Sequence, residues 1–150
     1  MPSDLAARPA AAPATQDLGL LLARVMLVAL FLVSGWMKLS NPGRTAGYLG
    51  SLGLPMPGIL VWLVIATELL LPLLLLLGVR ARWVALALAG FTVLTALSGH
   101  RFWEFDAATQ AQQFNGQMTQ FLKNLGIAGG FLVLGLVGPG RFSLDARRHG

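Results

Sequence analysis

Long apolar stretches alternate with short polar ones along this 150-residue chain. Each stretch is about 20 residues long, which is the length a helix needs to cross the hydrocarbon core of a bilayer. Backbone polar groups must be hydrogen-bonded internally in lipid, so we predict helices there rather than isolated strands. The predicted spans cover residues 18–39, 57–78, 81–99 and 119–137. The expected fold is an all-α integral membrane protein, a four-transmembrane-helix bundle.

The segments outside these spans are richer in polar residues, glycine and proline. Residues 1–16 are expected to form a flexible Ala/Pro-rich tail, and residues 141–150 a basic C-terminal tail, on either side of a membrane domain covering 17–140. Residues 41–56 are predicted to form an interfacial loop with room for one short amphipathic helix. Residues 101–120 are predicted to be a surface loop or an amphipathic helix.

Composition and charge support a membrane protein and exclude several other classes. Hydrophobic residues make up 55% of the chain, charged residues 11%, and the mean hydropathy is +0.69. The net charge of +5 does not indicate a nucleic-acid partner, because the basic residues lie singly at the ends of apolar runs. With no cysteine and two histidines on opposite predicted sides, we expect no metal or haem bound by this chain alone.

Aromatic and basic residues mark the predicted membrane boundaries. Trp36, Trp62, Trp83 and Trp103 lie near predicted span ends, where indole rings prefer the headgroup region. Six basic residues on the terminal side oppose four on the other side, which predicts cytoplasmic termini. The first group is Arg8, Arg80, Arg82, Arg141, Arg147 and Arg148, and the second is Lys38, Arg44, Arg101 and Lys123.

Glu68 is an acidic residue near the middle of an apolar span. An ionisable residue at that depth usually faces a bundle interior and has a partner. Pro72 follows four residues later and removes the helical hydrogen-bond donor for the Glu68 carbonyl. We predict an ion pair between Glu68 and Arg24 and a proton or ligand site at Glu68. The alternatives are a Glu68 that only ties helices together and an Arg24 that snorkels to the headgroups.

Polar residues at the opposite span ends form a second candidate site. A cationic pocket there suits a small anion or the polar head of a quinone, because cations and amides stabilise a developing oxyanion. Ordinary interfacial anchoring is the alternative. The expected lining residues are Lys38, His100, Lys123 and Asn124, with Phe102 and Trp103 at the mouth.

Several motifs resemble the DoxX family of small four-helix bacterial inner-membrane proteins. These are Arg24 with FLVSGWMKLSNP, GLPMP before TELLLPLLLLLGVRAR, GHRFW, and FLKNLGIAGG followed by GPGRFSLDARR. The family takes its name from a membrane subunit of a quinol oxidase. The resemblance therefore implies an inner-membrane protein that acts as a small subunit of a quinone-linked oxidoreductase, with a protein partner or a homo-oligomeric state. It supplies no catalytic residues.

The mechanism expected from these residues gives Glu68 and His100 the catalytic roles. Glu68 relays protons with Arg24 as its counter-ion, and a quinone is the one expected cofactor. The alternatives are a non-enzymatic scaffold or assembly partner of a redox or stress-defence complex, and a small-anion transporter. The scaffold predicts tolerance of Glu68→Gln and sensitivity at Gly126 and Gly130, whereas the transporter predicts uptake without a quinone.

Overall fold

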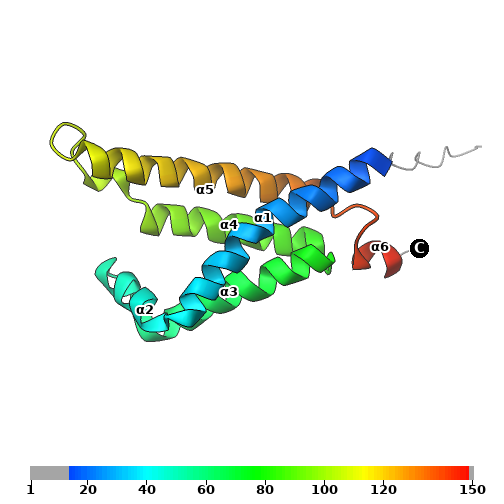
Figure 1. Ribbon diagram of the computed structural model, residues 1–150, viewed down its shortest axis with the longest axis horizontal. Helices are drawn as coiled ribbons and strands as arrows, with labels where there is room; N and C mark the ends of the chain where they lie inside the picture. The colour runs from blue at the N-terminus through cyan, green and yellow to red at the C-terminus, as the bar shows by residue number, and fades with distance from the viewer. Residues whose placement is uncertain (1–13, 149–150) are drawn as a thin grey trace, which may run out of the picture.

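The structure is a computed structural model that describes residues 14–148 as a bundle of helices (Figure 1). No strand occurs within this range, so the predicted all-α four-span fold is confirmed. Four of the helices are long and apolar enough to cross a membrane: α1, α3, α4 and α5. The elements are α1 (Ala14–Ser40), α2 (Pro42–Ser51), α3 (Pro57–Leu77), α4 (Ala81–Gly99), the 3₁₀ turn η1 (Phe102–Glu104), α5 (Ala111–Val137) and α6 (Leu144–Arg148).

The spanning helices form two pairs, α1 with α3 and α4 with α5. Glycine allows a close approach within each pair. A Cβ at Gly35 would lie 2.8 Å from a Leu69 methyl carbon, and one at Gly135 would lie 2.7 Å from a Leu86 methyl carbon. Figure 1 shows that the two pairs lie together near α6 and diverge toward the end that carries α2. The bundle is therefore closed at one end and open at the other.

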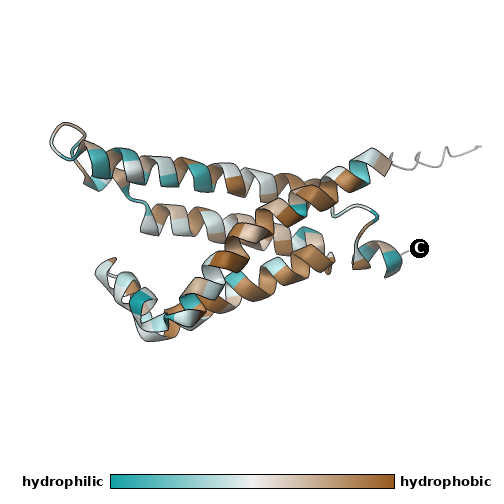
Figure 2. Ribbon diagram, in the orientation of Figure 1, coloured by the Kyte–Doolittle hydropathy of each residue, from teal (hydrophilic) through white to brown (hydrophobic). Residues whose placement is uncertain are grey.

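The closed end contains the main hydrophobic core. Leu75, Leu88 and Phe131 are completely buried there, and Phe31 contacts the Phe131 ring at a centroid distance of 5.4 Å. The surface is also largely apolar along the helices, whereas polar residues concentrate on α2, the start of α5 and α6 (Figure 2). The four tryptophans have exposed fractions between 51% and 75%. Such exposure of large apolar side chains suits a protein surrounded by lipid.

The segment after α5 crosses the closed end and binds two other elements. The Arg141 amide donates to Asp17 Oδ1 of α1 at 2.8 Å. The Asp145 carboxylate accepts the amides of Arg80 and Ala81, both at 2.8 Å, at the start of α4. A carboxylate at a helix N-terminus satisfies free amides and complements the helix dipole. Residues 138–148 therefore act as a strap across the closed end, a name we use below.

Several predicted boundaries differ from the structure. α1 already begins at Ala14, so residues 14–16 belong to a helix and not to the predicted N-terminal tail. The rest of that tail, residues 1–13, lies outside the described residues, as do 149–150 of the C-terminal one. α5 begins at Ala111, eight residues before the predicted span, because the glutamine-rich stretch continues the helix beyond the apolar part. The predicted C-terminal tail contains most of the strap, including α6.

Candidate functional site

A cavity of about 350 Å³ lies at the open end, between the two helix pairs and beneath α2. It takes residues from α1, α2, α3, α4 and α5, so only the folded bundle forms it. Its lining is mixed, with an apolar part and several polar side chains. The apolar members are Leu30, Phe31, Leu49, Leu52 and Val64, and the polar ones are Ser34, Lys38, Thr45, Tyr48, Glu68, Thr95, Ser98, His100, Gln120 and Asn124.

The wall formed by α1 and α3 carries an ion pair. Lys38 Nζ lies 2.6 Å from Glu68 Oε2 and also donates to the Ser34 hydroxyl. The pair forms because Gly35 lets α3 approach α1 closely. A Cβ added at Gly35 would lie only 3.1 Å from Glu68 Cβ. Lys38 stands one helical turn further along the same face. The Glu68 side chain is only 8% exposed. Its counter-ion, Lys38, also lines the cavity.

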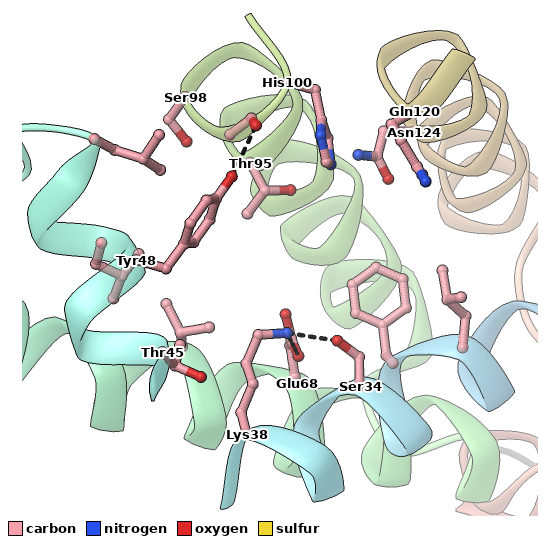
Figure 3. Close-up of a pocket in the computed structure, with 16 residues that line it drawn as sticks. Ser34, Lys38, Thr45, Tyr48, Glu68, Thr95, Ser98, His100, Gln120 and Asn124 are labelled. Carbon is pink, nitrogen blue, oxygen red and sulfur yellow. Dashed lines mark hydrogen bonds and ion pairs between the residues drawn. The ribbon is translucent and has the colours of Figure 1, made fainter. Parts of the chain in front are cut away.

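The opposite wall, from α4 and α5, carries His100, Gln120 and Asn124 (Figure 3). His100 follows the last residue of α4, and its Nδ1 lies 2.9 Å from Gln117 Oε1. With the Gln117 amide oxygen turned toward the ring, Nδ1 is the donor of this contact and Nε2 can accept a hydrogen bond. Figure 3 shows this wall facing the Lys38–Glu68 pair across the cavity.

α2 covers the outer side of the cavity. Asn41 caps this helix by accepting the Arg44 amide at 3.1 Å, and Pro42 occupies its first turn. Tyr48 reaches from α2 to the far wall, where its hydroxyl donates to the Gly99 carbonyl at 2.9 Å. This hydrogen bond connects the two diverging pairs across the open end.

The predicted Arg24–Glu68 ion pair is wrong. Arg24 is completely buried, but its guanidinium donates to the carbonyls of Leu75 at 3.4 Å, Leu76 at 3.0 Å and Phe142. Arg24 therefore lies beside the C-terminal end of α3. Glu68 precedes Leu75 by seven residues, which is roughly 10 Å along the helix axis. Free carbonyls at a helix C-terminus accept hydrogen bonds from a cation and interact favourably with its charge.

The structure also brings together only part of the predicted cationic pocket. Lys38, His100 and Asn124 line the cavity, but Lys123 is exposed on α5 and does not. Phe102 and Trp103 are absent from the lining too. They pack edge-on against each other at a centroid distance of 5.2 Å and both contact Phe121. Residues predicted for separate midplane and outer-face sites line one cavity, in which Glu68 neutralises Lys38.

The sequence interpretation missed several lining residues. Ser34 is a single polar residue among small or apolar neighbours, Thr45 directly follows Arg44, and Gln120 lies one turn before Asn124 on α5. Tyr48 is the one tyrosine of the chain and sits on an amphipathic segment. Those features are signals of a polar face, but they do not reveal which helices meet.

Comparison with known proteins now identifies the family. The sequence model described as DoxX matches residues 19–101, more than half of the chain. The Escherichia coli K12 inner membrane protein YqjF is 39% identical over 130 residues, which cover 87% of this chain and 92% of YqjF. The chain belongs to the DoxX family. Inner membrane protein YphA of the same organism is 35% identical over 85% of this chain and 89% of its own length.

The DoxX match includes most of the cavity. Lys38, Tyr48, Glu68 and His100 lie within it, whereas Gln120 and Asn124 come from the following helix. As a DoxX protein with four candidate spans, the chain is an integral membrane protein. No solved structure matches it significantly. Within residues 14–148, no three His, Asp or Glu side chains are grouped to hold a metal ion.

Proposed function

We propose that this DoxX protein is a small subunit of a quinone-linked oxidoreductase and that the cavity binds the quinone ring. The observation that carries the proposal is the arrangement of polar groups on two facing walls with apolar residues between them. A quinone has the matching pattern, with two carbonyl oxygens at opposite ends of an apolar ring. The volume of about 350 Å³ also lies within the usual range for small-ligand sites.

The residues of the two walls have complementary roles in this proposal. A bound quinone supplies the redox chemistry by accepting two electrons and two protons. Lys38 donates a hydrogen bond to one carbonyl oxygen, and Glu68, its carboxylate counter-ion, relays the proton that this end requires. Asn124 donates its amide to the other oxygen. His100 exchanges the second proton through Nε2, because Gln117 fixes the Nδ1 side of the ring.

The location and the partner belong to the same proposal. We place the chain in a bacterial inner membrane, since both relatives bear the name inner membrane protein. We also place both termini in the cytoplasm. Arg80, Arg82 and Arg141 gather at the closed end, in agreement with the positive-inside rule. The electrons come from a partner protein, and the catalytic centre is completed by that partner or by a second copy.

Binding of a short-chain quinone analogue tests the cavity. We expect His100→Ala and Asn124→Leu each to raise the Kd about three- to tenfold, because each removes one hydrogen bond to the ligand. Lys123→Ala is the matched control, since Lys123 adjoins Asn124 but does not line the cavity. Equilibrium dialysis of the purified full chain in nanodiscs measures the Kd. Equal Kd values for all four proteins would contradict the proposal.

A membrane scaffold is the second candidate, and one feature of α5 favours it. A Cβ at Gly126 or Gly129 would meet no atom within 4 Å, so this face of α5 is open to another helix. Gly130, by contrast, packs against Leu27 within the chain at 3.1 Å. Gly126 and Gly130, the two positions at which the scaffold function predicts sensitivity, therefore face different surroundings.

Substitution at the open glycine separates the two functions. If the chain is a scaffold, Gly126→Leu releases the proteins that copurify from native membranes, because the larger side chain blocks close helix approach. The quinone Kd should stay unchanged. For an oxidoreductase subunit we expect Glu68→Gln to abolish quinone-linked turnover of the purified complex. Full turnover in Glu68→Gln with loss of copurifying proteins in Gly126→Leu would favour the scaffold.

A further inference from the structure

A second hollow adjoins the cavity on the side of α2. Its volume is about 420 Å³. It shares Ser34, Lys38, Thr45 and Tyr48 with the cavity, so the two spaces meet along this line of residues. The remaining lining residues, Met37, Asn41 and Arg44, are exposed. We call this space the outer hollow.

Lys38 is the residue that connects the outer hollow with Glu68. Lys38 lines both spaces, whereas Glu68 lines only the cavity. Their side chains are 26% and 8% exposed, so Lys38 is the more accessible member of the pair. Ser34 and Thr45 add hydroxyl groups along the boundary between the two spaces. Hydroxyls of this kind can hold water molecules in a chain.

The opposite direction is closed by apolar packing. Beyond Glu68 toward α6 lie Leu75, Leu88 and Phe131, each with an exposed fraction of 0%. Arg24 is buried at that end, where its guanidinium donates hydrogen bonds to backbone carbonyls. Water therefore has a polar route to Lys38 from the side of α2 and an apolar barrier from the side of the strap.

We propose that the outer hollow is the aqueous entrance through which the Lys38–Glu68 pair is reprotonated. This inference rests on the proposed function and adds the side of proton uptake. Reduction of one quinone forms two O–H bonds, so it consumes two electrons, which the partner supplies, and two protons. Each proton given by the pair is replaced from water in the outer hollow. The proton that the pair gives is thus taken from the face on which α2 lies, opposite to the strap, while His100 gives the second one.

The charged groups around the pair are consistent with this route. α2 contributes Arg44 at the outer hollow and α4 contributes His100 across the cavity, while α5 contributes the amides of Gln120 and Asn124. Glu68 is thus the acidic group of the cavity lining. Its carboxylate, next to the Lys38 ammonium, is the proton acceptor on this route.

Sided thiol labelling tests the entrance, because the chain has no native cysteine to interfere. We use the full-length chain in right-side-out and inside-out membrane vesicles and a charged reagent that does not cross the bilayer. Ser34→Cys should react from the same face as Thr109→Cys, which lies between η1 and α5. Val28→Cys, on α1 but 2% exposed in the core, is the matched control and should not react. Arg147→Cys on α6 reports the other face.

The outcomes separate the entrance from the proposed function. Ser34→Cys that stays unlabelled, or that reacts from the Arg147→Cys face, overturns the entrance even if quinone binding is as expected. Thr45→Cys, on α2, serves as a second variant should Ser34→Cys fail to fold. Labelling as expected, together with equal quinone Kd values for all variants, overturns the proposed function and supports an aqueous entrance to the pair.

Discussion

Lys38→Met is expected to lower the free energy of unfolding by about 3 kcal/mol. Breaking a buried pair by removing one partner typically costs about 3–5 kcal/mol, because the other charge is left uncompensated. We expect the lower end, since Lys38 keeps 26% of its side chain exposed. Reversible denaturation of the purified protein in mixed micelles, followed by circular dichroism, measures the change.

A second substitution in the same chain tests whether the cost comes from the pair itself. Lys38→Met combined with Glu68→Leu removes both charges, and its stability should return to within about 1 kcal/mol of the original protein. Lys123→Met removes an exposed lysine and should change stability by less than about 0.5 kcal/mol. A double variant as unstable as Lys38→Met alone would show that the unpaired carboxylate is not the cause.

Gly78→Ala is expected to be comparably damaging, also by about 3 kcal/mol. Gly78 ends α3 at φ +70°, where an L-residue costs about 1–2 kcal/mol. The added Cβ would also lie 2.3 Å from Ser143 Cβ and 2.8 Å from its Cα, so the strap must move. Overpacking of this kind typically costs about 1–3 kcal/mol. The same denaturation measurement applies.

Two other glycines separate the contributions at Gly78. Gly53 has φ +74° but no atom within 4 Å of an added Cβ, so Gly53→Ala should show the backbone cost alone, about 1 kcal/mol. Gly58, in the first turn of α3, has neither strain nor a close neighbour, and Gly58→Ala should not destabilise the protein. Equal losses at Gly78 and Gly53 would mean that the strap does not pack against Gly78 as described.

The four spans were predictable from sequence because a bilayer imposes length and hydropathy on each helix separately. The start of α3 at Pro57 and both ends of α4, Ala81 and Gly99, were predicted correctly. The start of α5 was not, since Gln112, Gln113 and Gln117 are good helix formers that no apolar pattern reveals. Hydropathy detects the part of a helix that lies in lipid and misses its polar extension.

The site was less predictable because the relative positions of the helices along the membrane normal decide which side chains pair. Counter-ion rules correctly require a partner for Arg24, but they do not distinguish a carboxylate from the free carbonyls of Leu75 and Leu76. Once Gly35 fixes the contact between α1 and α3, Lys38 reaches Glu68 and Arg24 does not. The sequence pattern predicts which residues share a face of a helix. It does not predict how far one helix is shifted along its axis relative to its neighbour.

The strap has a consequence for how the protein is made. Arg24 enters the membrane with α1, yet one of its three acceptors, Phe142, lies 118 positions later in the chain. During synthesis this guanidinium lacks that acceptor until residue 142 has left the ribosome. α1 is thus secured by a segment that is made after the other three spanning helices, so assembly of the bundle is completed only once the strap has been synthesised.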